Sequence, residues 1–500
     1  MKRILTFLTF STLAAAQTRP LVLSRSEYEG RVHGAWMGQV IGTLAGLPFE
    51  GRPASSPLVR VETFNKPYQS APIDDDYYYE YLALLGFEKY GIGMTADQLG
   101  QVWKEHGAGA FGSSNEARIQ LAKGVPGSQS GHPRYNRYWW TIGPQFSADI
   151  YGMIAPGDPN LAGRLARTYG HVNGYAEGAD GAVFIAGMVS LAFRESDPKA
   201  VVRQAARLIH PASPYRQCLD MVISMAEKGA PPEKVFRAVE DRWRRQYDRV
   251  NNGVANGGLV AASVWFGGGD YLETVNLAFR AADFSDADCN AANAGAVAGA
   301  LKGIKALPAA LADPLHDRIT GARMGRLELK FPVDESISGI ARRVAAVGLK
   351  MLAAHNARVS DAGITVPYRA IATQPAELFQ AADYMQYWNP DWKLERAAIG
   401  ETYLDGDVLI TGPAAESSGV LLRRRAKLGP NPGLEIEAGA GESRGWLLEA
   451  TVNNEKILER RIEGPGVKIE ADLSRFSGQE VELRLFQRGP SARWKGIRLR

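Results

Sequence analysis

The sequence predicts a large all-α domain followed by a small all-β domain, and three observations lead to this division. Alanine-rich helical stretches follow one another from about residue 24 to about residue 358, where alternating strand patterns are nearly absent. After residue 400 the pattern repeats every two residues, in short runs separated by Gly, Pro, Asn and Ser. The chain has 500 residues, 45% of them apolar, which suffices for two or three buried cores.

The first residues have the pattern of a secretory signal peptide. Lys2 and Arg3 precede an apolar run over residues 4–13, and Ala14 to Ala16 form a small-residue cleavage site. The run has about ten residues, roughly half of what a helix needs to cross a bilayer. We therefore expect residues 1–16 to be removed and the mature protein to be periplasmic or extracellular, without a membrane span. An uncleaved N-terminal anchor is the alternative.

The first helix is predicted to begin at Ser24 or Ser26 and to run toward Gly46, before Pro48 stops it. Glycine recurs on it at every fourth position: Gly30, Gly34, Gly38, Gly42 and Gly46. Each helical glycine costs about 1 kcal/mol relative to alanine, so the stripe indicates a closely approaching second backbone. The helix after Asn290 has a matching stripe, Gly295, Gly299 and Gly303. We expect these two helices to pack together in the centre of the helical domain.

The remaining elements follow from the same periodicities. Further helices are predicted at residues 161–169, 181–193, 200–209, 232–247 and 274–282. Strands are predicted at residues 408–410, 419–422, 434–437, 445–452, 456–461, 467–472, 480–486 and 494–499. The expected domains are the signal peptide 1–16, a helical domain 25–372, an aromatic- and proline-containing linker or collar 373–399, and a β-sandwich 400–500.

Charge and cysteine content exclude several classes of protein. The net charge is only +4 and the basic residues are scattered, except for Arg423 to Arg425, so no nucleic-acid surface is indicated. The two cysteines, Cys218 and Cys289, allow at most one disulfide. Neither cysteine lies in a CxxC or CxxH arrangement, which excludes a structural zinc site of that kind.

Two acidic clusters carry the strongest chemical signal. Asp74, Asp75 and Asp76 stand directly before an apolar helical stretch, and Asp286 and Asp288 stand before the second glycine-striped helix. Aspartates at a helix start often act only as caps. If the two stripes meet, however, both clusters converge at one end of the helix pair, where carboxylates at close range repel one another unless cations lie between them. Oxygen ligands favour magnesium, manganese or calcium over zinc.

Several motifs occur in one order along the chain: Arg31–Ala35, Gly46–Gly51, Asp74–Asp76, Ile142–Gln145, Asp149–Gly152, Pro156–Pro159 and Asp286–Asn290. In this order and spacing they resemble the ADP-ribosylglycohydrolase family, over about residues 25–350. The resemblance implies an all-α catalytic domain and a metal-dependent glycoside hydrolase that cleaves an ADP-ribosyl or related ribosyl or furanosyl bond. The alternative is an inactive family member that binds a glycan or a nucleotide sugar, against which the retained carboxylates argue.

The resemblance also implies site residues. Two Mg²⁺ ions, or Mn²⁺, would be bound by Asp74, Asp75, Asp76, Asp286, Asp288 and Cys289. Glu50, as acid/base or gating carboxylate, and Asp75 would be catalytic. Substrate contacts would come from His171, Asn173, Gly174 and Asn290, although His171 is more often a core or loop histidine.

Three features depart from the family pattern or remain open. Asp74 stands where the family has threonine, although another register places Ile73 there. Cys289 replaces a final threonine and offers a soft sulfur in place of a hard oxygen. In the β domain, Trp446 and Trp494 are either core residues or sugar-stacking residues, so carbohydrate binding is an expectation for that domain. From the family resemblance, the expected partner of the protein is a small-molecule or glycoside substrate.

Overall fold

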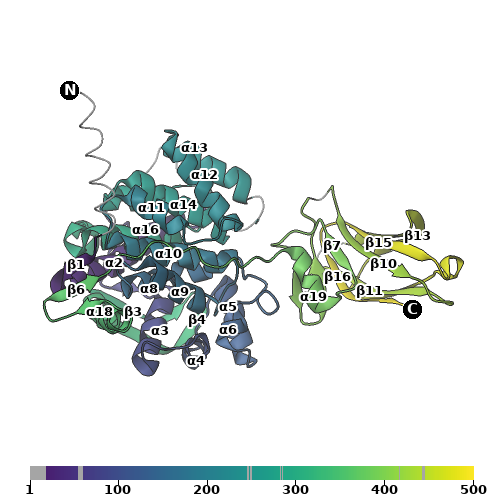
Figure 1. Cartoon of the computed structure of the whole chain (residues 1–500), viewed down its shortest axis with the longest axis horizontal. Coiled ribbons are helices and arrows are strands. Elements are labelled where there is room, and N and C mark those ends of the chain that lie inside the picture. Colours follow the sequence, from purple (N-terminus) through teal and green to yellow (C-terminus); the bar gives the residue numbers. More distant parts are fainter. Residues whose placement is uncertain are drawn as a thin grey trace. The chain divides into compact units, whose positions relative to one another are not determined.

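The computed structural model describes residues 19–53, 60–244, 247, 250–281, 283, 285–415, 417–441 and 445–500 (Figure 1). The chain forms two compact units. The first ends at Leu378, and the second comprises Phe379–Arg500 together with the segment Pro133–Tyr138. The predicted signal peptide lies outside the described residues. Among the described helices, none is long and apolar enough to cross a membrane.

The first unit is helical, which confirms the predicted fold class. Its longer helices are α2 (Arg25–Gly46), α3 (Asp75–Tyr90), α4 (Ala96–His106), α5 (Gly112–Ala122), α9 (Pro159–Gly170), α10 (Glu177–Ala192), α11 (Pro198–Ala206), α12 (Pro214–Glu227), α13 (Pro232–Val239), α14 (Gly253–Gly267), α15 (Tyr271–Phe279), α16 (Ala287–Lys302) and α18 (Ile337–Ala354). Single-turn helices are α6 (Gly127–Ser130), α7 (Gly143–Phe146), α8 (Asp149–Met153) and α17 (Ala309–Ala312). Helix α2 starts at Ser24, whose side chain and that of Glu27 form the predicted capping box.

The two glycine-striped helices, α2 and α16, pack against each other at backbone contact distance. A Cβ atom added at Gly38, Gly42 or Gly46 would lie 2.4, 2.1 or 2.6 Å from a backbone oxygen of α16, closer than any side chain tolerates. The facing pairs run in opposite order along the two helices: Gly34 with Gly299, Gly38 with Gly295, Gly42 with Ala291, and Gly46 with Ala287. The helices are therefore antiparallel.

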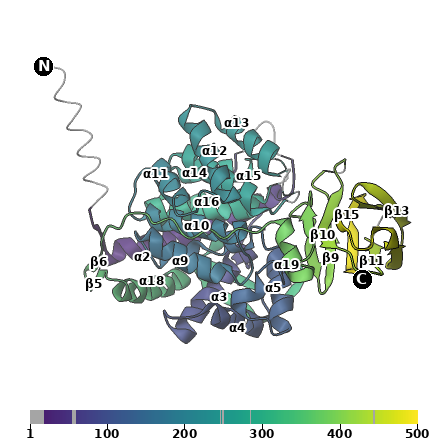
Figure 2. The same cartoon turned by 45° about the vertical axis from the view of Figure 1, so that its right-hand side comes forward.

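Antiparallel packing places the end of α2 beside the start of α16. Helices α10, α14 and α15 pack against α16, and α18 packs against α2, so this pair forms the centre of the unit (Figure 2). Gly30 is the exception within the predicted stripe, because a Cβ atom there would meet nothing within 4 Å.

A small sheet interrupts the helical pattern, and the sequence did not predict it. Strand β2 (Ala71–Pro72) pairs in parallel with β3 (Arg318–Met324), which forms a hairpin with β4 (Leu327–Ser336). Gly321 of β3 lies against Ile73, where an added Cβ would be 2.3 Å from the isoleucine side chain. The chain passes from β2 through Ile73 directly into the aspartate run, so this sheet fixes the start of α3.

Only one face of β4 is covered. Apolar residues stand at every second position of β4 from Leu327 to Val333, a pattern that was not predicted as a strand, and of these Leu329 and Val333 are buried. A second small sheet has the strand order β1 (Leu21–Ser24), β6 (Gly363–Val366), β5 (Arg358–Val359).

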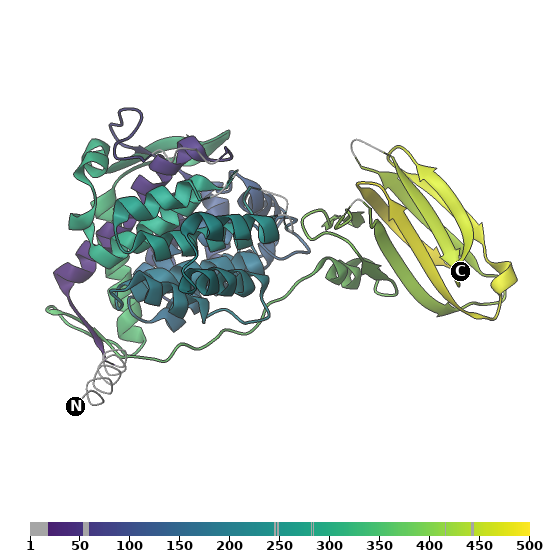
Figure 3. The same ribbon diagram turned by 90° about the horizontal axis from the view of Figure 1, so that it is seen from above.

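The second unit is a β-sandwich, as predicted (Figure 3). One sheet has the strand order β13 (Glu455–Ile462), β12 (Trp446–Val452), β15 (Glu480–Arg488), β10 (Val420–Lys427), β7 (Lys393–Glu395). The other sheet has the order β14 (Val467–Asp472), β11 (Gly433–Ala440), β16 (Ala492–Leu499), β9 (Val408–Thr411), β8 (Tyr403–Asp405). Trp446 and Trp494 come from opposite sheets, are fully buried, and have ring centroids 5.0 Å apart. Both tryptophans are thus core residues.

The segment predicted as a linker, residues 373–399, is divided between the two units. Residues up to Leu378 belong to the first unit, where the backbone N–H of Gln374 donates to the Leu208 carbonyl at 2.8 Å. The second unit begins at Phe379 and includes the single-turn helix α19 (Met385–Trp388) and strand β7. Strand β7 pairs with β10, so the sandwich includes residues that precede position 400.

Candidate metal centre

Three helix ends meet at one place in the first unit. The chain leaves α2 through the short helix η1 (Leu47–Phe49) and turns at Glu50. The backbone N–H of Gly51 then donates to the Ser285 carbonyl, 3.1 Å away, just before α16. Both aspartate clusters therefore lie near Glu50, as the paired glycine stripes led us to expect.

The aspartate run forms the start of α3. Asp74 is the N-cap residue, and its carboxylate accepts the backbone N–H of Asp76 at 3.3 Å, so the capping role is present. Asp76 is completely buried and accepts a hydrogen bond from Thr43 Oγ1 at 2.9 Å. Asp75 hydrogen-bonds Asp74, and burial followed by the Asp74 and Asp76 charges raises the pKa of Asp75 well above its usual value.

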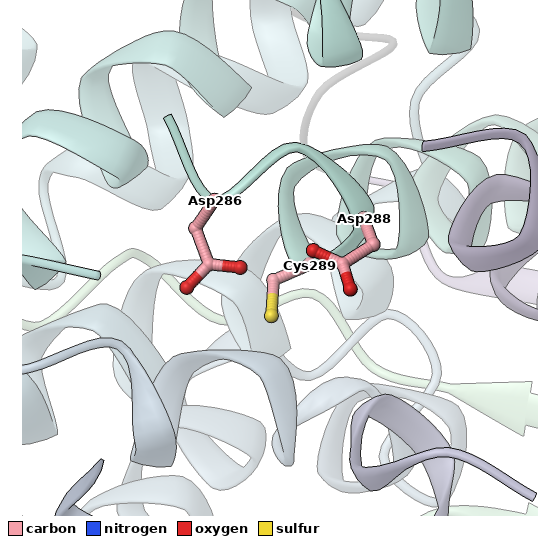
Figure 4. A group of neighbouring side chains, drawn as sticks. All are labelled: Asp286, Asp288 and Cys289. Atoms are coloured by element: carbon pink, nitrogen blue, oxygen red, sulfur yellow. The ribbon is translucent and has the colours of Figure 1, made fainter. Parts of the chain in front are cut away.

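The start of α16 supplies the second half of the cluster (Figure 4). Asp286 is its N-cap, Asp288 lies in the first turn, and Cys289 follows; each is 6% exposed. Asn256 of α14 positions this turn by accepting both the backbone N–H of Asp286, at 3.2 Å, and the Asn290 side-chain amide, at 2.8 Å.

Two overlapping groups of side chains have donor atoms close enough to share a metal ion. The first group is Asp74, Asp76 and Asp288, and the second is Asp286, Asp288 and Cys289. Within each group the donor atoms all lie within 4.8 Å of one another. Asp288 belongs to both groups, so one carboxylate could serve two adjacent cation sites.

Electrostatics indicate that this cluster suits divalent cations. Burial, followed by the Asp286 and Asp76 charges, raises the pKa of Asp288 well above its usual value. Burial, followed by the Asp74 charge, does the same to the pKa of Asp76. One oxygen of each of these carboxyls, Asp76 Oδ1 and Asp288 Oδ1, is buried without a hydrogen-bond partner among the described residues. Cations would both neutralise the charges and satisfy these oxygens.

Glu50 lies at the exposed rim of the cluster. Desolvation by the surrounding protein, followed by the Asp286 and Asp74 charges, raises the pKa of Glu50 to about 7. A carboxyl with a pKa near neutrality suits a group that both donates and accepts a proton.

A second layer of polar residues lies one helical turn behind the cluster, and of its members the sequence motifs included only Asp149. The Glu80 carboxylate accepts the backbone N–H of Asp149 at 2.9 Å and the Gln39 amide at 3.3 Å, and Asn293 donates to Asp149 at 2.7 Å. Burial raises the pKa of Asp149 to about 8. Glu80 follows Asp76 by four residues, and Asn293 follows Cys289 by four. This helical spacing was the sequence signal that could have predicted the second layer.

The predicted substrate residues are not gathered into one group. His171 Nε2 is 3.1 Å from the Glu377 carboxylate, and the buried Asn173 donates to Ser114 Oγ at 3.1 Å. A Cβ atom at Gly174 would lie 2.3 Å from Pro144, so close packing accounts for that glycine. Asn290 follows Cys289 directly in the first turns of α16, beside the second aspartate pair. These contacts give His171, Asn173 and Gly174 structural roles, and their substrate contacts stay predictions.

The chain belongs to the ADP-ribosylglycohydrolase family, whose family model matches residues 24–349. A solved structure described as an "ADP-ribosylglycohydrolase-related protein complex" is similar at 16% sequence identity, with a TM-score of 0.43. That similarity covers 65% of this chain and 98% of the other chain. No curated protein sequence matches the chain significantly.

Proposed function

We propose that this protein is a metal-dependent glycoside hydrolase that cleaves an ADP-ribosyl or related ribosyl or furanosyl bond at a dinuclear centre. Membership of the family supports a glycohydrolase-type function in general. One observation supports the dinuclear centre in particular. The buried Asp288 belongs to both groups of candidate metal ligands. The oxygen donors favour Mg²⁺, with Mn²⁺ as the nearest substitute.

Different residues would bind the metal ions, transfer the proton and position the ligands. Asp74, Asp76, Asp286 and Asp288 would hold the cations, with Asp75 adjacent. When bound, divalent ions supply positive charge and polarise the oxygens of the sugar and of the attacking water. Glu50 would exchange a proton with the leaving group or with water, because glycosidic cleavage needs a proton donor as oxocarbenium character develops. Asn256 and Thr43 would hold the carboxylates in place.

The proposal is tested by incubating the full-length protein, with magnesium and with chelator, with ADP-ribosyl conjugates and a panel of other glycosides. Hydrolysis that chelator abolishes and added divalent metal restores is the expected result. Metal and ligand binding without turnover of any glycoside would favour the alternative, an inactive member that binds a glycan or a nucleotide sugar. Because we also propose export, the panel includes glycosides that occur outside the cytoplasm.

Glu50→Gln should lower kcat by about 10²–10⁴-fold, because the amide neither donates nor accepts the transferred proton. Metal affinity measured by calorimetry should change little. The pH profile gives a second test: the ionisation of Glu50 should appear in wild-type kcat at or below about pH 7, since bound cations offset the neighbouring aspartates that raise its pKa. A kcat for the variant close to that of the wild type would remove Glu50 from the reaction.

We also propose that the sandwich contributes substrate binding rather than chemistry. A chain that ends at Leu378, the last residue of the first unit, should turn over small glycosides nearly as the full-length protein does. Binding to a polymeric glycan should weaken by about 10²-fold, since a tethered module raises effective concentration. Pull-down and turnover assays measure the two effects. Loss of activity on all substrates would show that the second unit is needed by the catalytic one.

A further inference from the structure

The two groups of candidate ligands at the centre are chemically unequal. The group Asp74, Asp76 and Asp288 offers only carboxylate oxygens, whereas the group Asp286, Asp288 and Cys289 includes a thiol. Oxygen donors suit Mg²⁺ well, but sulfur is a poor ligand for that ion and a good one for borderline transition ions. The two groups can therefore prefer different metal ions.

The Cys289 thiol is placed as a ligand would be. It follows Asp288 in the first turn of α16, is 6% exposed, and its sulfur lies within 4.8 Å of a carboxylate oxygen of both Asp286 and Asp288. Figure 4 shows its sulfur between the Asp286 and Asp288 carboxylates. Cys289 is a free cysteine, as is the buried Cys218 of α12, so neither thiol is held in a disulfide.

A second observation points to an ion at the same place. Asp288 belongs to the thiol-containing group and is 6% exposed. Its Oδ1 atom is buried and has no hydrogen-bond partner among the described residues. An unpaired carboxyl oxygen beside a thiol and a second carboxylate costs free energy in the metal-free protein. A divalent ion would satisfy it.

We propose that the group Asp286, Asp288 and Cys289 binds a borderline divalent transition ion, Zn²⁺ in preference to Mn²⁺ or Mg²⁺, so that the centre holds two different metals. This inference rests on the proposed dinuclear centre. On binding, the Cys289 S–H bond breaks, the thiolate becomes a ligand, and the proton passes to the solvent. The carboxylate group of Asp74, Asp76 and Asp288 keeps its preference for Mg²⁺.

Cobalt substitution tests the inference without any assay of activity. Full-length protein is stripped with chelator, and Co²⁺ is added while the near-ultraviolet absorbance is recorded. Coordination by Cys289 should give a thiolate-to-cobalt charge-transfer band. The band should be absent from Cys289→Thr, which keeps an oxygen in place of the sulfur, and present in Cys218→Ala, which removes the other thiol.

Calorimetric titrations with Zn²⁺ and Mg²⁺ supply the second readout. Zn²⁺ affinity of Cys289→Thr should fall by about 10²-fold or more, since even residues behind the ligands cost about 10–100-fold when replaced. Mg²⁺ affinity should be nearly unchanged. Cys289→Ser serves in the same comparison if the threonine variant does not fold.

The outcomes separate this inference from the proposed function. Two bound Co²⁺ ions without a charge-transfer band, or a band that persists in Cys289→Thr, would overturn the thiol ligand while leaving the hydrolase proposal intact. A Cys289-dependent band in a protein that cleaves no glycoside would uphold the thiol ligand and contradict the proposed activity. Equal loss of Zn²⁺ and Mg²⁺ affinity in Cys289→Thr would contradict selective binding.

Discussion

Asp288→Asn should abolish high-affinity binding of both metal ions and lower kcat/KM by about 10²–10⁴-fold, because this carboxylate belongs to both ligand groups. The metal-free variant should nonetheless unfold at a higher temperature than the metal-free wild type. Burial and neighbouring charges raise the pKa of Asp288, so removing its charge relieves repulsion in the folded state. Calorimetry, steady-state kinetics and thermal unfolding in chelator measure the three effects.

Matched variants show whether the loss of both ions comes from Asp288, the residue that the two ligand groups share. Asp76→Asn and Asp286→Asn each alter one ligand group, so each should keep measurable binding of one ion. Asp220→Asn, on the exposed side of α12 beside Arg216, makes the same chemical change away from the centre and should bind metal as the wild type does. Two ions bound with wild-type affinity in Asp288→Asn would refute the assignment of the centre.

The metal-free protein should become less stable as the pH rises from about 4 to about 8, and bound metal should lessen this loss of stability. The pKa of Asp149 is raised from 3.8 to about 8 and that of Glu50 from 4.5 to about 7. Between the usual pKa and the raised pKa of each group, the folded protein binds more protons than the unfolded chain. The free energy of unfolding is therefore greatest below the usual pKa and falls as the pH rises to the raised pKa.

Thermal unfolding between pH 5 and pH 8 measures this dependence. In chelator we expect the Tm to fall by about 5–10 °C over the range. With saturating divalent metal we expect a smaller fall, because cations offset the aspartate charges near Glu50 but leave Asp149 buried. Asp149→Asn should flatten the metal-free profile, since its amide does not titrate. A metal-free Tm that is constant or rises toward pH 8 would show that the buried carboxyls do not control stability.

The local periodicity of the chain was enough to predict most of the fold. The glycine stripes predicted the central helix pair. The period-two runs predicted eight strands of the sandwich, for example β14 at Val467–Asp472, but not β7 or β8. The β3–β4 hairpin was not predicted, although apolar residues stand at every second position of β4 from Leu327 to Val333. Pro332 lies within this run, and a proline there argues against a strand.

The sequence by itself determined which residue types stand at the helix starts and that two helix backbones must approach closely, because glycine spacing and capping are local properties. Only the tertiary structure decided how they combine. The antiparallel direction of α2 and α16 brings Glu50 to Asp286, makes Asp288 common to both ligand groups and turns the Cys289 thiol toward the carboxylates. The tertiary structure also pairs Glu80 with Asp149 and places His171 beside Glu377. Such contacts join residues far apart in the chain, and burial and charge repulsion arise only when the packed helices exclude water from them.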